Sequence, residues 1–263
     1  MIKRDQPNIF NSLNLQAIVS SKSDGNTKPE WGPLAQTTTN IEKIIVGVGA
    51  ELENVVIMNV GADQTHWDTI REVTIRDSGA GGRDPKTRIV ADALVTNTPG
   101  LALLLPTADC NPVIMYDPTH HALALVHLGW QSTVAGLAQK TLSFMRQAYN
   151  VDPAQLLVYF GPAIKATSYV FDAPLDQADD LAWQPFLQKT PQGIGIDLGG
   201  YNRQQLYEVG VKPAHVQICP VDTATSADYF SHYRSVRTGE PEGRFATVCK
   251  LNLKTHPTTS PSR

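Results

Sequence analysis

The sequence predicts an α+β fold, with mixed β-sheets and flanking helices. Two apolar runs, Asn111–Tyr116 and Ala122–Val126, lie on either side of a turn signal and predict a β-hairpin. Downstream, Ser132–Ala148 has apolar residues at helical spacing, and Leu156–Phe160 has the composition of a buried strand. Strand, helix and strand in succession, next to an antiparallel hairpin, are typical of a mixed fold.

Shorter patterns extend this prediction along the chain. We expect further strands at Leu15–Ser20, Val55–Val60, Leu101–Leu105, Ile194–Leu198 and Ala214–Cys219, the first of them at a sheet edge. We expect further helices at Asn40–Gly49, Asp176–Trp183 and Tyr201–Val209. Because no repeat or low-complexity segment interrupts them, we predict one domain over residues 1–253 and a disordered tail over residues 254–263.

Composition narrows the class of protein. A net charge of −3, with 18% charged and 41% hydrophobic residues, gives no basic surface for nucleic acid and no acidic tail. No apolar run is long enough to span a membrane, and the first ten residues lack the apolar segment of a signal peptide. Three widely spaced cysteines without a CxxC pair favour a reducing compartment. We therefore expect a cytoplasmic enzyme with a small-molecule substrate, and no nucleic-acid or membrane partner.

The predicted hairpin brings one cysteine close to one histidine. If Tyr116 and His121 close the loop, Cys110 lies directly opposite His127. Opposed Cβ atoms on antiparallel strands are about 4.5–5.5 Å apart, near enough for a thiolate and an imidazole to share one metal ion or one proton. The register thus predicts half of a metal site, or alternatively a structural cysteine beside a hydrogen-bonded histidine.

Six short segments match the signatures of a known family. They are Gln64–His66, Ala91–Thr96, Thr107–Pro112, His127–Trp130, Gly161–Ile164 with Tyr169, and Tyr229–Arg234 with Thr238 and Gly239. In that order they resemble the QVH, ADALVT, TADCxP, HxGW, GPxI…Y and FFSxRR…TGR motifs of the YfiH family. Its members are variously named polyphenol oxidase (laccase), multifunctional purine nucleoside enzyme and peptidoglycan editing factor.

The resemblance implies a single-domain YfiH-like catalytic fold with one metal ion, usually zinc and alternatively copper. Its ligands would be His66, Cys110 and His127. A zinc ion with three protein ligands keeps one position open and lowers the pKa of bound water to roughly 7. The implied reactions are deamination of adenosine and phosphorolysis of the N-glycosidic bond of purine nucleosides, with nucleoside and phosphate as substrates.

Four further residues are candidates for roles around the metal. Asp109, beside the metal cysteine, and His232 are candidates for proton transfer. Asp109 could instead brace the hairpin through hydrogen bonds to the backbone. Arg234 is suited to bidentate binding of phosphate or carboxylate, and Gln64 to a contact with the substrate.

The chain lacks three arginines of the family pattern. The family has arginine where this sequence has Ile41, Gln131 and Tyr233. Phosphorolysis requires recognition of phosphate, so it is the activity that these departures affect most. Metal-assisted hydrolysis is affected least.

Several other functions use the same residues. A metal-dependent amidase that edits peptidoglycan precursors would need the same ligands. A metal-free thiol hydrolase would use Cys110 as nucleophile and His127 as base. A copper-dependent phenol oxidase is less favoured, because a lone His₂Cys site lacks a trinuclear cluster and no HxH motif is present. A structural zinc site is also less favoured, since it normally has four protein ligands.

Overall fold

The computed structural model describes residues 1–61, 65–172 and 180–253. The predicted tail, Gln64 and the first half of the predicted helix at Asp176–Trp183 therefore lie outside the described residues. The second half of that helix is described, and its residues Leu181–Trp183 form a turn.

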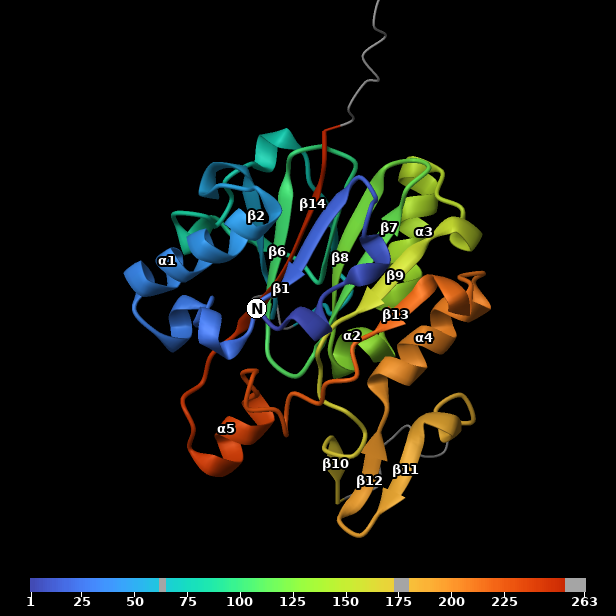
Figure 1. Cartoon of the computed structure of the whole chain (residues 1–263). Coiled ribbons are helices and arrows are strands. Elements are labelled where there is room, and N and C mark those ends of the chain that lie inside the picture. Colours follow the sequence, from blue (N-terminus) through green and yellow to red (C-terminus); the bar gives the residue numbers. More distant parts are fainter. Residues whose placement is uncertain (62–64, 173–179, 254–263) are drawn as a thin grey trace, which may run out of the picture.

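Two β-sheets packed face to face form the centre of the molecule (Figure 1). The first contains, in spatial order, β1 (Leu15–Val19), β14 (Phe245–Leu251), β6 (Ala102–Thr107), β2 (Val55–Asn59) and β4 (Ile89–Val90). The second contains β13 (Val216–Ile218), β9 (Leu157–Phe160), β7 (Asn111–Asp117), β8 (Ala122–Leu128), β5 (Ala93–Thr96) and β3 (Ile70–Glu72). Each sheet has parallel and antiparallel pairs. The predicted α+β class with mixed sheets is confirmed, and β1 is an edge strand as expected.

Helices cover the outer faces of both sheets (Figure 1). Helix α1 (Leu34–Ile45) packs on the first sheet, and α3 (Leu137–Tyr149) and α4 (Leu198–Glu208) lie on the second. At one end of the sandwich lie α2 (Trp130–Val134), α5 (His232–Thr238) and a small sheet of β10 (Val170–Phe171), β12 (Gly193–Ile196) and β11 (Leu187–Thr190). In the described part of the chain, no helix is long and apolar enough to cross a membrane.

Single turns of 3-10 helix connect many of these elements. They are Lys3–Asp5, Asn8–Phe10, Lys22–Asp24, Pro29–Trp31, Val46–Val48, Leu52–Asn54, Ile75–Asp77, Pro85–Thr87, Pro153–Gln155, Gln184–Phe186 and Pro213–His215.

Two predicted helices have different limits in the structure. Helix α1 begins at Leu34, well before the predicted start at Asn40. The apolar pattern did not predict its first turns, because they are mostly polar. The predicted helix over Ser132–Ala148 is two helices, α2 and α3. Gly136 separates them with a left-handed φ of 72°, which glycine adopts without strain.

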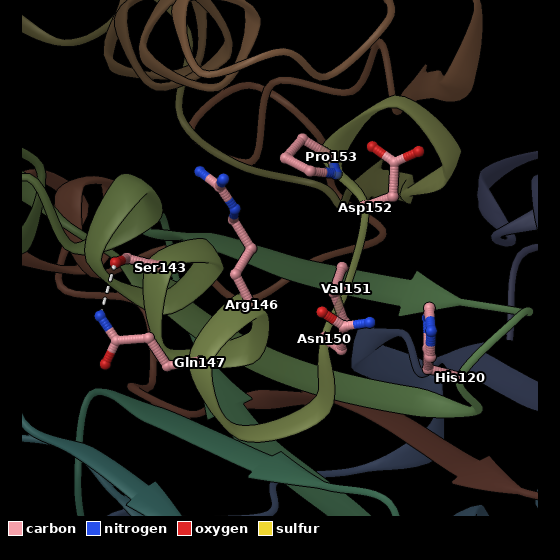
Figure 2. A pocket seen from close by; sticks show the side chains of 8 residues that line it. All are labelled: His120, Ser143, Arg146, Gln147, Asn150, Val151, Asp152 and Pro153. Atoms are coloured by element: carbon pink, nitrogen blue, oxygen red, sulfur yellow. Dashed lines mark hydrogen bonds between the residues drawn. The ribbon is translucent and has the colours of Figure 1, made fainter.

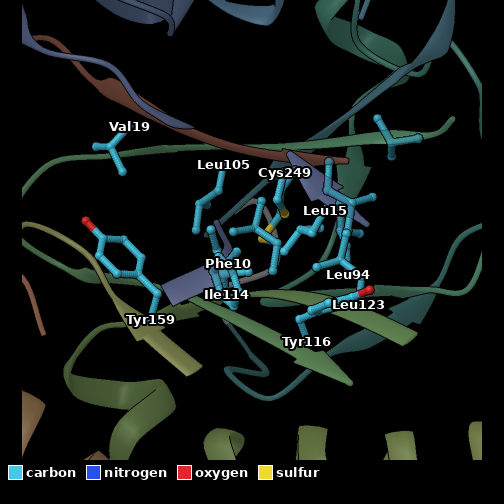
Figure 3. Close-up of a cluster of buried hydrophobic side chains, with 14 of the residues drawn as sticks. Phe10, Leu15, Val19, Leu94, Leu105, Ile114, Tyr116, Leu123, Tyr159 and Cys249 are labelled. Carbon is cyan, nitrogen blue, oxygen red and sulfur yellow. The ribbon is translucent and has the colours of Figure 1, made fainter. Parts of the chain in front are cut away.

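The strand alternation assigns each side chain of the hairpin to one face. On β7, Ile114 and Tyr116 point into the core between the sheets, which Figure 3 shows, and Val113 and Met115 point towards the helices. On β8, Leu125 joins the same inter-sheet core. Full burial of such a side chain contributes roughly 1.5–3 kcal/mol. The pattern of burial therefore fixes the register parity of the hairpin, since a slip of one residue would exchange the side chains that face the inter-sheet core with those that face the helices.

The predicted pairing of the hairpin is wrong by two residues. Asp117 pairs with Ala122, so Pro112, rather than Cys110, lies opposite His127. The cause is the Asp117 side chain, whose Oδ1 accepts hydrogen bonds from the backbone N–H groups of the next turn, at 2.7 Å from Thr119 N. This turn keeps Asp117 in the strand. A shift of two residues preserves the face on which each side chain lies.

Candidate functional site

Cys110 and His127 lie close together at one end of the inter-sheet core. A Cβ atom placed on Gly129 would be 2.9 Å from Cys110 Sγ and 3.4 Å from His127 Cε1. Both side chains therefore border the small space left by the missing side chain of Gly129. The two residues meet diagonally across the hairpin, as the preserved parity requires, and not directly opposite each other.

Backbone contacts hold this end of β8 in place. Ser132 Oγ accepts a hydrogen bond from Gly129 N at 2.9 Å and donates one to His127 O at 3.0 Å. The backbone N–H of His127 donates to Asp92 O at 2.8 Å. The segment that carries the imidazole is thus tied to both α2 and the start of β5.

Burial keeps both side chains neutral in the absence of a metal. It raises the pKa of Cys110 to about 12, with a further contribution from the negative charge of Asp109. Burial, together with the positive charges of Lys28 and Arg244, lowers the pKa of His127 to about 4. A thiolate–imidazolium pair, which a thiol hydrolase requires, is disfavoured in this environment.

The donor atoms of Cys110 and His127 fit a metal ion. His127 Nδ1 is buried and has no hydrogen-bond partner in the structure as described. A neutral imidazole nitrogen of this kind can serve as a metal ligand, and a thiol loses its proton when it binds zinc. These two residues therefore supply a soft sulfur and a free nitrogen within a shared space, which are donors that zinc prefers.

His66 stands apart from the other two expected ligands. It is exposed, and its Nδ1 lies 2.9 Å from Thr65 Oγ1. It borders a small pocket together with Asp92, the residue whose carbonyl oxygen binds the backbone of His127. Across the described ranges, no three His, Cys, Asp or Glu side chains are grouped closely enough to hold a metal ion. Two of the three expected ligands are therefore assembled, and His66 lies nearby without joining them.

Asp109 has a bracing position directly before Cys110. Its backbone is left-handed, with φ of 73°, a conformation that Asp adopts more readily than most residues. Its Oδ1 accepts a hydrogen bond from Thr223 Oγ1 at 2.6 Å, and its Oδ2 accepts one from Tyr233 N at 2.7 Å. The backbone carbonyl of Asp109 accepts a third from Ile164 N at 2.9 Å. Through its carboxylate and its carbonyl, Asp109 thus contacts three other segments of the chain, in line with the bracing alternative.

His232 and Arg234 have different surroundings on α5. The side chain of His232 is 57% exposed, and its Nδ1 lies 2.5 Å from Glu242 Oε1. Arg234 is mostly buried, and its guanidinium binds Glu240 and a series of backbone carbonyls, of which the closest is Thr223 O at 2.7 Å. Its donors hold the loop before α5 rather than point to an open space. Gln64 lies outside the described residues.

Three cations that the fold brings together were missed in the sequence. Lys28, Arg88 and Arg244 come from distant segments and lie outside the motifs compared above. The charges of Lys28 and Arg244 help to lower the pKa of His127, and Arg88 donates a hydrogen bond to the carbonyl oxygen of Thr27, beside Lys28. Only the fold brings these residues together, and no local pattern marks them.

Another hollow in the surface lies away from the pair. Figure 2 shows one of about 680 Å³ beside the end of α3, bordered by Arg146, Asn150 and His120. His120 belongs to the turn of the β7–β8 hairpin, at the opposite end from Cys110. This hollow contains none of the residues that the sequence singled out for the site.

The fold and this pair define a two-sheet α+β protein with a candidate metal centre at one end of its sandwich. A family model described as "Multi-copper polyphenol oxidoreductase laccase" matches residues 32–252. The chain belongs to this family, the YfiH family, as the resemblance of its motifs predicted.

Individual relatives agree with this assignment. A purine nucleoside phosphorylase of Bacteroides thetaiotaomicron is 26% identical over 224 residues, which cover 83% of this chain and 82% of that protein. The crystal structure of the hypothetical protein YfiH of Bacillus licheniformis is similar with a TM-score of 0.79 and 26% identity, covering 90% of this chain and 93% of the other. The structure of YlmD from Geobacillus stearothermophilus has a TM-score of 0.77 at the same identity and coverage.

Proposed function

We propose that this protein is a metal-dependent enzyme of purine nucleosides, with Cys110, His127 and His66 as ligands of a zinc ion. The observation that carries the proposal is the buried Nδ1 of His127, which lies near the sulfur of Cys110 and has no hydrogen-bond partner among the described residues. The names of relatives as purine nucleoside phosphorylases support the substrate class. A bound zinc ion would supply a Lewis acid for the reaction.

The protein's own residues give this centre its shape. Gly129 leaves space beside the sulfur and the imidazole, and Ser132 fixes the backbone on which His127 lies. Asp109 holds the segment before Cys110 against the loop that leads to α5. We assign Asp109 a positioning role, and we retain His232 as the candidate for proton transfer because its imidazole is exposed.

His66 is the ligand whose position must change if the proposal is right. It already lines the same small pocket as Asp92, whose carbonyl oxygen accepts a hydrogen bond from the backbone of His127. A rotation of an exposed side chain costs little compared with the free energy of structural zinc binding, about 10–16 kcal/mol in zinc-finger peptides. Formation of the third bond on metal binding is therefore energetically reasonable.

A substrate panel tests the proposed reaction. The purified full chain, loaded with zinc, is incubated with inosine, guanosine or adenosine, with and without phosphate. Release of free purine and ribose 1-phosphate that depends on phosphate is expected, and Cys110→Ser should abolish it. Ammonia release from adenosine alone would assign the centre to deamination instead.

The same panel separates the other candidate reactions. Release of amino acids from muropeptide precursors would favour an amidase, and oxygen consumption with phenols would favour the oxidase after which the family model is named. Turnover of peptidoglycan precursors without any turnover of nucleosides would contradict the proposal.

A further inference from the structure

Arg88 is a buried cation that no carboxylate of the described residues contacts. The residue is only 7% exposed. Within the part of the chain that the structure describes, its side chain donates a single hydrogen bond, from Nη2 to Thr27 O at 3.3 Å, and its buried Nε has no partner. Among the described residues, no carboxylate lies within 4 Å of it. A guanidinium has five N–H donors, and a buried charge normally has a partner of opposite sign. Arg88 therefore lacks an anion that its environment requires.

The loop around Thr27 brings two further cations to Arg88. Thr27 N and Thr27 Oγ1 both donate to Arg244 O, at 3.0 and 2.9 Å. Lys28 follows in the chain, and burial lowers its pKa, with contributions in the same direction from the charges of Arg244 and Arg88 and an opposing one from Glu30. Three positive groups from three segments thus lie within reach of one another.

Only two of these cations have a nearby carboxylate. Lys28 Nζ lies 3.8 Å from Glu30 Oε1, and Arg244 Nη1 lies 2.8 Å from Glu242 Oε2. In the described ranges Arg88 has none at such a distance, although the charge of Glu30 also acts on it and opposes the lowering of its pKa by burial. Three cations thus share two carboxylates, and the group carries an excess of positive charge in a partly buried setting. The ligand that such a group of cations binds best is a multivalent oxyanion.

Two of the three cations, Lys28 and Arg244, act on the candidate metal centre, and Arg88 lies beside them through its bond to Thr27. Phe245 pairs with Thr107 where β14 runs antiparallel to β6. Arg244, the residue before Phe245, therefore lies at the end of this pair that leads through Ala108 to Cys110. Arg88 comes shortly before Asp92, whose carbonyl binds the backbone of His127. The electrostatic influence of Arg244 on both Cys110 and His127 agrees with this placement.

We infer that Lys28, Arg88 and Arg244 form a binding site for inorganic phosphate beside Cys110 and His127. They would take the place of the arginines that the chain lacks at Ile41, Gln131 and Tyr233. The assignment of the phosphate as a reactant rests on the proposed function.

The chemistry assigns these cations a clear task. In phosphorolysis, a phosphate oxygen forms a bond to C1′ of the ribose while the bond between C1′ and the purine nitrogen breaks. The electron pair of that bond goes to the purine, which takes up a proton, and the products are ribose 1-phosphate and free base. Arg88 can hold the phosphate in a bidentate manner, and Lys28 and Arg244 can neutralise its second charge.

Isothermal titration calorimetry with sodium phosphate, and separately with adenosine 5′-monophosphate, tests this inference on the full chain. The variants are Arg88→Met and, in case that variant is unstable, Lys28→Gln. The matched control is Arg146→Gln, which removes one exposed cation from the hollow of Figure 2. We expect saturable binding of phosphate that both site variants weaken at least tenfold and that the control leaves unchanged.

Four results would overturn the inference. They are the absence of saturable phosphate binding in the wild type, equal binding in the site variants, loss of binding in Arg146→Gln alone, and binding of the nucleotide but not of free phosphate. Because no nucleoside is present, the measurement is independent of the proposed reaction. Normal phosphate binding with no cleavage of any nucleoside would contradict the proposed function and leave the phosphate site in place.

Discussion

The carboxylate of Asp109 accepts a hydrogen bond from the Thr223 hydroxyl at 2.6 Å, and so connects the residue before Cys110 to the loop before α5. Its other oxygen accepts from Tyr233 N at 2.7 Å. We predict that Asp109→Ala lowers the free energy of unfolding by about 2–4 kcal/mol, because it leaves one buried and one partly buried donor unpaired. Thermal unfolding should shift down by roughly 5–10 °C.

Asp109→Asn separates bracing from proton transfer. The amide can accept from Tyr233 N–H and donate to the Thr223 hydroxyl, and Asn tolerates the left-handed backbone. A bracing role predicts a stable variant with substantial activity. An inactive Asp109→Asn protein of unchanged thermal stability would instead assign Asp109 to proton transfer.

Gly129→Ala tests the space beside the cysteine. The new methyl group would be 2.9 Å from Cys110 Sγ, which is too close for the sulfur to remain in place. The backbone φ of −93° suits alanine, so the strain falls on the site and not on the fold. We expect at least a tenfold loss of metal affinity, measured by competition with a chromophoric chelator. Wild-type affinity in a well-folded variant would show that the metal does not use this space.

Arg234 is predicted to act on stability rather than on substrate binding. Arg234→Met removes its ion pair with Glu240 and its bonds to the loop carbonyls, at a cost of about 2–4 kcal/mol in the free energy of unfolding. Chemical denaturation measures this loss. Arg237→Met on the same helix is the control, since Arg237 is exposed and stacks on Tyr233; it should cost less than about 1 kcal/mol. An Arg234→Met protein of normal stability with a raised KM for phosphate would contradict this account.

The sequence predicted the elements of the site better than its exact geometry. The apolar pattern of the hairpin defines which face each residue occupies, and this parity is sufficient to bring Cys110 towards His127. It does not define the register, because the turn depends on the side chain of Asp117 and its bonds to Thr119 and His120. A local pattern of apolar residues carries no information about such a capping interaction.

Long-range pairing explains most of what the sequence did not predict. Strand β14 was missed, so the sequence did not show what pairs with β1 and β6 in the first sheet. The same holds for Arg88 and Lys28, which come together only where the loop after β1 passes β4. The contacts of Asp109 with Thr223 also span distant segments, so the sequence alone could not choose between its two roles.

Metal content by mass spectrometry tests the central claim most directly. The chain is purified without added metal or a histidine tag, and wild type is compared with Cys110→Ser, His127→Ala and His66→Ala. His215→Ala, in the turn before β13, is the matched control. The account predicts about one zinc ion per chain in the wild type and the control, and a loss of zinc in all three ligand variants. Metal-free wild-type protein in which iodoacetamide readily alkylates Cys110 would contradict it.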